Sequence, residues 1–262
     1  MLLLYTRNAG DAKCSCFVVI SQFRYNAPAL FYLARNQPMP VPAPADQAKV
    51  GLVHQRLVET YGRLTLAPGG NPLDELIGTI LSQNTSDVNS GRAYAQLRAM
   101  YPSWEEVLDT SDDELYEAIK PAGLGRIKAP RIKNTLREIL KRCGELNLDF
   151  LEQLPLEESK RWLTSLDGIG PKTAACVLLF ALGRPALPVD THVHRVSRRL
   201  GLIGPRVGAD AAHTLLEAAL PPEHVYEFHI DMIRHGRRIC HAQRPDCAKC
   251  MLRDLCDYYA VC

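Results

Sequence analysis

Apolar residues recur at helical spacing along most of the chain beyond residue 45. The stretches 46–61 and 131–143 are amphipathic, 73–81 is apolar, and 171–182 is apolar on nearly every face. A helix that is apolar all round belongs in the interior of a fold. No stretch of useful length alternates apolar and polar positions as a half-buried strand does. The pattern therefore predicts an all-α fold with residues 171–182 near its centre.

Short local signals indicate where one of these helices begins and ends. Ser111 and Glu114 match a capping box, in which both side chains satisfy backbone amides that a helix start leaves free. Pro121 ends that helix, and the Gly-Leu-Gly that follows predicts a turn around Leu124.

The first part of the chain carries a different signal. Residues 1–37 show no clear period, and residues 38–44 form a proline-rich tract that is typical of a linker. We therefore expect residues 1–45 to be an extension outside the folded domain, either disordered or the product of a misassigned start.

Composition and charge narrow the setting. The chain of 262 residues contains no apolar run long enough to cross a membrane and no secretory signal, so we expect its nine cysteines to lie in a reducing cytosol. Residues 121–200 carry 14 Lys and Arg against 8 Asp and Glu, whereas the whole chain has a net charge of +2. A basic segment of this kind is expected for a phosphate-bearing partner. A solvated helical face would explain it too.

Four cysteines close to the end of the chain predict a metal centre. They are spaced as Cys240-x6-Cys247-x2-Cys250-x5-Cys256. Tetrahedral thiolate sites hold zinc or iron–sulfur centres. Structural zinc usually takes two tight pairs, whereas here one close pair has a long arm on each side. The spacing therefore favours iron–sulfur, although it matches no ferredoxin pattern. Zinc, a disulfide or no centre at all are the alternatives.

The segment Leu-Asp-Gly-Ile-Gly-Pro-Lys-Thr, residues 166–173, combines a glycine hairpin with a helix start. Gly168 and Gly170 allow a tight turn, and Pro171 suits the first position of a helix. Backbone amides of such a hairpin form an anion site that suits a DNA phosphate. Lys172 falls in the first helical turn, where the macrodipole disfavours a cation and so favours the free amine that a nucleophile requires. A hairpin that merely joins two helices, with a solvated surface lysine, is the simpler alternative.

Asp190 precedes a predicted helix that ends near Leu200, so an N-cap role is its simplest explanation. Asp190 and Lys172, each delivered by a helix start, would also be able to face one pocket. There the carboxylate would stabilise a developing sugar cation while the amine attacks the anomeric carbon. His192 and His194 lie two residues apart, face different sides of a helix and make a poor pair of zinc ligands. The signature of zinc deaminases is absent.

The chain resembles the endonuclease III family of DNA glycosylases in three segments. They are, in this order, LDGIGPKTAA, VDTHVHRVSRRLGL and the four-cysteine motif. The segment Ile-Leu-Ser-Gln-Asn-Thr, residues 80–85, is similar to the minor-groove loop of that family. The resemblance covers residues 46–262. It implies two helical lobes with a DNA cleft between them. One lobe is a six-helix barrel with a helix-hairpin-helix motif over residues 66–184, and the other joins residues 46–65 to residues 185–262 and holds a 4Fe–4S cluster.

The resemblance also implies roles for individual residues. Lys172 matches the nucleophilic lysine of the family and Asp190 its catalytic aspartate, while the four cysteines match the cluster ligands. Either Gln83 or Asn84 would fill the space left by a flipped base, and Leu124 would be a second wedge. The DNA contacts that the resemblance implies are Gln83, Asn84, Leu124, Gly168, Gly170, Thr173, His192 and Arg244.

The function implied by the resemblance is base excision repair. The enzyme would flip oxidised pyrimidines such as thymine glycol out of duplex DNA, cleave the glycosidic bond through a lysine Schiff base and nick the strand by β-elimination. It would act as a monomer on double-stranded DNA with a damaged base or an abasic site. We expect it in the cytoplasm, on the nucleoid in a bacterium, and without membrane contact.

Three other functions fit parts of the sequence. An adenine-specific mismatch glycosylase would carry a glutamate just before the Gln83 loop, yet residues 78–81 contain none and Lys172 is present. A non-catalytic iron–sulfur protein that binds DNA would need neither Lys172 nor Asp190. A zinc-stabilised scaffold would lack the visible absorbance of an iron–sulfur centre.

Overall fold

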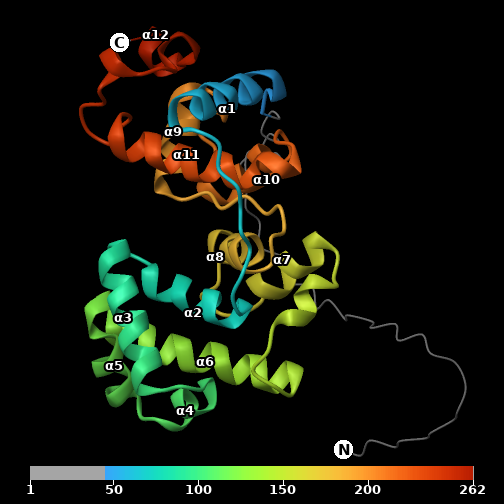
Figure 1. The fold of residues 1–262 in the computed structure, drawn as a ribbon, viewed down its shortest axis with the longest axis vertical. Helices are drawn as coiled ribbons and strands as arrows, with labels where there is room; N and C mark the ends of the chain where they lie inside the picture. The colour runs from blue at the N-terminus through green and yellow to red at the C-terminus, as the bar shows by residue number, and fades with distance from the viewer. Residues whose placement is uncertain (1–44, 262) are drawn as a thin grey trace, which may run out of the picture. The chain divides into compact units, whose positions relative to one another are not determined.

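The computed structural model describes residues 45–261, so the prediction for residues 1–44 lies outside the described part. Within that part the fold is all-helical and contains no strand, which confirms the predicted class (Figure 1). The helices are α1 (Gln47–Tyr61), α2 (Pro72–Ser82), α3 (Asp87–Met100), α4 (Trp104–Asp109), α5 (Asp112–Ile119), α6 (Gly125–Cys143), α7 (Leu156–Thr164), α8 (Pro171–Cys176), α9 (Thr191–Leu200), α10 (Ala209–Glu217), α11 (Val225–Arg238) and α12 (Asp257–Ala260).

The predicted capping signals are present as hydrogen bonds. Ser111 Oγ accepts from the Glu114 amide at 3.2 Å, and Glu114 Oε2 accepts from the Ser111 amide at 2.9 Å, so the capping box at the start of α5 is confirmed. Asp46 caps α1 by accepting from the amide of Ala48 at 2.9 Å. These reciprocal bonds satisfy donors that a helix start leaves without an intrahelical partner.

Helix α6 begins earlier than the sequence pattern predicts. The pattern predicts a helix over 131–143, whereas the structure starts it at Gly125 and carries Pro130 within it. A Cβ at Gly125 would lie 2.8 Å from the ring of Tyr116, so this glycine is required by close packing and is not a sign of a flexible turn. The buried ammonium of Lys128 bonds the carbonyls of Leu81 and Ala122, which fixes the first turn of α6.

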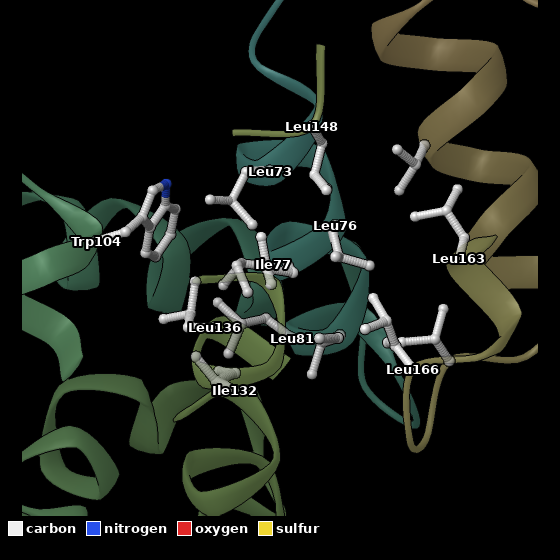
Figure 2. Packing of buried hydrophobic residues seen from close by; sticks show 14 of the residues in the cluster. Leu73, Leu76, Ile77, Leu81, Trp104, Ile132, Leu136, Leu148, Leu163 and Leu166 are labelled. Atoms are coloured by element: carbon white, nitrogen blue, oxygen red, sulfur yellow. The ribbon is translucent and has the colours of Figure 1, made fainter. Parts of the chain in front are cut away.

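Buried apolar side chains form two clusters. The first gathers residues of α2, α3, α5 and α6 together with parts of α7 and α8. Figure 2 shows Leu76 and Ile77 of α2 in its centre, with Leu136 of α6 on one side and Leu163 of α7 on the other. The second gathers residues of α1, α9, α10 and α11. The domain boundaries at residues 65 and 185 stay a prediction.

The predicted central helix joins these clusters. It consists of α8 followed by a π-helical turn over Val177–Ala181, and its apolar residues are buried as predicted except Phe180, which is half-buried. Val177 and Leu178 pack in the first cluster, while Leu179 packs in the second. Because α8 is held from both sides, its first turn is a rigid support for Lys172. In the part of the chain that the structure covers, no helix is long and apolar enough to span a membrane.

Candidate active site and metal centre

The glycine hairpin leads directly into α8. Gly168 has a φ of 73°, and a Cβ there would lie 2.6 Å from Arg131 Nε, so both its backbone and its surroundings require glycine. Gly170 is the N-cap residue of α8 and Pro171 its first residue, as the sequence predicts. Both glycines are exposed. The hairpin therefore presents backbone to the solvent immediately before Lys172.

Lys172 and Asp190 line the same two cavities. The first, which we name the Glu75 cavity, has a volume of about 550 Å³ and is lined by Glu75, Thr79 and Phe180 in addition. The second, the Asn84 cavity, has a volume of about 810 Å³, and residues 82–85 and His192 contribute to it. Lys172 and Asp190 belong to both, so they lie where the two cavities adjoin.

Asp190 is the N-cap of α9, as its position in the sequence predicts. Its Oδ1 accepts a hydrogen bond from the amide of Val193 at 2.7 Å. One carboxylate oxygen therefore anchors the helix start, and the second can act on a ligand in the adjoining cavities. The cap and a chemical role do not exclude one another, because the cap fixes the orientation of the carboxylate.

Glu75 and His229 also line the Glu75 cavity, and the sequence analysis did not identify either. Thr79 Oγ1 donates to Glu75 Oε1 at 3.1 Å, and burial raises the pKa of Glu75, although the charge of Lys172 acts in the opposite direction. Burial lowers the pKa of His229 to about 4, so its ring is neutral at pH 7 and its Nδ1 donates to Pro188 O at 2.8 Å. A signal for Glu75 was available, because residues 75, 79 and 82 fall on one face of α2.

Cys176, which the sequence suggests as a core residue, is buried on α8 and also reaches the Glu75 cavity. Burial raises the pKa of its thiol to about 11, against the opposing charge of Lys172. At neutral pH Cys176 is therefore a thiol and a poor nucleophile, so the amine of Lys172 has no thiolate competitor in the cavity.

Strained backbone coincides with three of the implied DNA contacts. Asn84, Leu124 and Arg244 have φ values of 54°, 52° and 50°, and among the described residues they are the non-glycine residues with positive φ. All three are exposed. A left-handed backbone costs a residue with a Cβ about 1–2 kcal/mol and persists where the surrounding structure imposes it, often at functional sites. For Leu124 that support is the bond from Lys128 to Ala122 O at 2.9 Å.

Gln83 and Asn84 differ clearly in their surroundings. Arg131 Nη1 donates to Gln83 Oε1 at 2.9 Å, and Gln83 Nε2 donates to Thr173 Oγ1 at 3.4 Å. The Gln83 amide is thus bound within the protein, whereas Asn84 is exposed on a left-handed turn. Thr173 is itself buried, so in this conformation it contacts Gln83 and not the surface. His192 is half-buried, with Nδ1 at 3.2 Å from Arg195 Nη2.

The four cysteines of the terminal motif line one common cavity. It has a volume of about 20 Å³ and lies between α9, α11 and the final segment, and Val196, Leu200 and Ile239 give it an apolar wall. In the described part of the chain all four are free thiols. No group of three or more His, Cys, Asp or Glu side chains within residues 45–261 is arranged to hold a metal ion. The all-sulfur donor set fits an iron–sulfur cluster by its chemistry, and zinc accepts the same donors.

Two of these sulfurs lie beside nitrogen atoms, one from a charged arginine and one from His235, whose pKa burial lowers to about 4. Arg199 Nη1 lies 3.3 Å from Cys240 Sγ, and His235 Nε2 lies 3.5 Å from Cys250 Sγ. Burial, reinforced by the other three cysteines, raises the pKa of Cys250 to about 11, so thiolates here need cationic partners. Helix α9 supports the motif further, because Arg195 donates to the carbonyl of Cys240 at 2.9 Å. One helix thus carries Asp190 at its start and holds the cysteine motif near its end.

Comparison with known proteins agrees with this arrangement. The HhH-GPD superfamily of base excision DNA repair proteins matches residues 77–222. The chain belongs to this superfamily. Endonuclease III of Thermotoga maritima is 36% identical over 189 residues, which are 72% of this chain and 84% of that protein. A candidate DNA glycosylase of Arabidopsis thaliana is 37% identical over 177 residues, 68% of this chain, and the match spans 60% of that relative, less than two thirds of its length.

Solved structures show the same similarity for this HhH-GPD protein. A non-covalent endonuclease III–DNA complex matches with a TM-score of 0.70 and 29% identity, over 82% of this chain and 97% of that chain. A trapped covalent endonuclease III–DNA intermediate matches with a TM-score of 0.70 and 29% identity, over 82% and 98% of the two chains. The protein is therefore an endonuclease III-like helix-hairpin-helix DNA glycosylase of base excision repair.

Proposed function

We propose that this HhH-GPD protein is a bifunctional DNA glycosylase and abasic-site lyase that removes oxidised pyrimidines from duplex DNA. The observation that carries the proposal is that Lys172 and Asp190, each delivered by a helix start, line the same two cavities. A protein that only binds DNA needs neither an amine nor a carboxylate at such a place. We expect the enzyme to act as a monomer, inside the cell and on the nucleoid in a bacterium.

Binding would begin with the phosphate backbone. The exposed amides at Gly168 and Gly170 and the exposed side chain of Arg244 are suited to hold phosphates and set the register. Asn84 and Leu124 would fill the space that an extruded nucleotide leaves in the stack. Their strained turns favour this role because the protein maintains them at a cost in free energy. Extrusion costs a few kcal/mol, and least for a damaged base that stacks poorly.

The chemistry follows from the two side chains that the cavities share. Lys172 Nζ attacks C1′ of the extruded nucleotide, the bond from C1′ to the base breaks, and the base leaves with the bonding electrons. The Asp190 carboxylate stabilises positive charge that develops on the sugar. Ring opening then gives a Schiff base between Lys172 and C1′. Loss of a proton from C2′ breaks the bond between C3′ and its oxygen, which nicks the strand.

The four cysteines would hold a 4Fe–4S cluster. When bound, the cluster supplies the positive charge that stabilises four thiolates in an apolar space, and its role is structural. Cys240 and Cys247 flank Arg244, so a filled site would fix the loop that carries this arginine. Four protein ligands leave no open position for a substrate.

The test is strand cleavage on two duplexes, one with a single thymine glycol and one with a preformed abasic site. The wild type should nick both, and Lys172→Gln should bind both duplexes yet nick neither. Cleavage of the abasic site alone would keep the lyase and reject thymine glycol as a substrate. Strand cleavage retained by Lys172→Gln would contradict the assignment of the nucleophile. No cleavage by the wild type, with tight binding, would favour a single-function glycosylase or a non-catalytic DNA-binding protein.

A further inference from the structure

Glu75 occupies an unusual position for an acidic residue. It lies on α2, whose neighbouring residues Leu73, Leu76 and Ile77 are fully buried in the first core cluster. Its side chain instead lines the Glu75 cavity together with Lys172. The chemistry derived above uses one amine and one carboxylate, and Asp190 already supplies the carboxylate. Asp87 also lines the cavity and pairs with Arg237 at 2.8 Å. Glu75 is therefore a further carboxyl group in the cavity, without a role in cleavage of the glycosidic bond.

The environment of this carboxyl group is only partly polar. Within residues 45–261 the hydrogen bond recorded for it comes from Thr79 Oγ1 to Oε1 at 3.1 Å. Oε2 is thus left for a ligand in the cavity. Desolvation of a carboxylate costs free energy unless hydrogen bonds replace the lost water, so an apolar residue would be the cheaper choice at this position. Burial removes water from this carboxyl group, and this desolvation raises the pKa of Glu75.

The two cavities differ in what they can accept. The Asn84 cavity includes Asn84, which the proposed function assigns to the emptied stack. The Glu75 cavity instead offers an aromatic face from Phe180 and an apolar side from Ile233. In the proposed reaction Lys172 Nζ bonds to C1′, so the base attached to C1′ lies close to this amine. The Glu75 cavity therefore offers an aromatic and an apolar side for a planar base, next to the charged side chains of Arg234 and Arg237.

We propose that Glu75 determines specificity by accepting, at Oε2, a hydrogen bond from an N–H group on the Watson–Crick edge of the extruded base. The inference rests on the proposed function and deepens it. The chemistry selects bases that present such a donor, either N3–H of a uracil-type lesion or the 4-amino group of a cytosine-type lesion. A hydrogen bond to a charged acceptor that is lost in the variant corresponds to a decrease of roughly 10- to 100-fold.

The test compares base excision with cleavage of a site that has no base. Single-turnover rates are measured for the wild type, Glu75→Leu and Glu75→Gln on duplexes with 5-hydroxyuracil, 5-hydroxycytosine or a preformed abasic site. Glu75→Leu should lower excision of at least one base by roughly 10- to 100-fold and change abasic-site cleavage by less than about 3-fold. Glu75→Gln keeps a carbonyl oxygen as acceptor and should recover part of the rate.

Each outcome has a distinct meaning. A loss confined to 5-hydroxyuracil assigns the bond to N3–H, a loss confined to 5-hydroxycytosine assigns it to the amino group, and both support the proposal. Equal losses on the base and abasic substrates would overturn it, because they would show that Glu75 positions Lys172. Unchanged rates on all three substrates would overturn it as well. A wild type that fails to cleave the abasic site would refute the proposed lyase function itself, which the Glu75 variants do not test.

Discussion

Replacing Lys128 with methionine should destabilise the protein by removing one buried ammonium group. Lys128 is 2% exposed, and its Nζ donates to the carbonyls of Leu81 at 2.7 Å and Ala122 at 2.9 Å. Methionine has similar length but no donor, so both carbonyl groups lose a charged partner. Each buried polar group left without a partner costs about 1–3 kcal/mol. Methionine also has no charge that must be desolvated on folding, which offsets part of the cost. We therefore expect the free energy of unfolding to fall by about 2–4 kcal/mol.

The same substitution should also weaken DNA binding. Leu81 lies just before the Gln83–Asn84 loop, and Ala122 lies just before the Leu124 turn, so one ammonium group holds both strained segments. Urea unfolding measures the free energy of unfolding, and fluorescence anisotropy on an abasic-analogue duplex measures Kd. Lys141→Met is the matched control, because Lys141 lies on the same helix, is exposed and pairs only weakly with Glu138 at 3.8 Å. The account is refuted if the two variants are equally stable and bind equally well.

The remaining predictions concern stability, the metal centre and the wedge. Burial raises the pKa of Asp231 to about 6, so its ionised form opposes folding as pH rises through that value. Asp231→Asn should therefore stabilise the protein by about 1–3 kcal/mol at pH 8 and have no such effect at pH 3.5. Urea unfolding at the two pH values measures the difference. Cys247→Ser should lower the bound iron per chain and the visible absorbance, and an unchanged metal content would show that the ligand set is wrong. Asn84→Ala should weaken binding to an abasic-analogue duplex more than an undamaged one. Gln83→Ala should mainly lower the melting temperature, and the reverse result would identify Gln83 as the wedge.

Local signals made much of the fold predictable. The capping box at Ser111, the N-cap at Asp190 and Pro171 at the first position of α8 depend on neighbouring residues alone, so the sequence pattern shows them directly. The predicted start of α6 at residue 131 was wrong because contacts with distant residues decide where this helix begins. Gly125 and Pro130 are typical of turns, but here tertiary packing against Tyr116 and the buried Lys128 decides the conformation.

Features of the site that depend on distant contacts were harder to predict. The choice between Gln83 and Asn84 depends on Arg131 and Thr173, which lie far from them in the sequence. The position of Glu75 in a cavity depends on α8 and α11, which lie far from α2 in the sequence. The neutral state of His229 has no local signal in the sequence, because it depends on burial and on the hydrogen bond to Pro188 O.

The central claim is that Lys172 forms a covalent bond with the sugar of an extruded nucleotide. Borohydride reduction of the protein with a duplex that carries one abasic site, followed by digestion and mass spectrometry, tests it most directly. The account predicts a reduced adduct on the peptide that contains Lys172 and none with Lys172→Gln. An adduct on another residue, or no adduct while the strand is still cleaved, would contradict it.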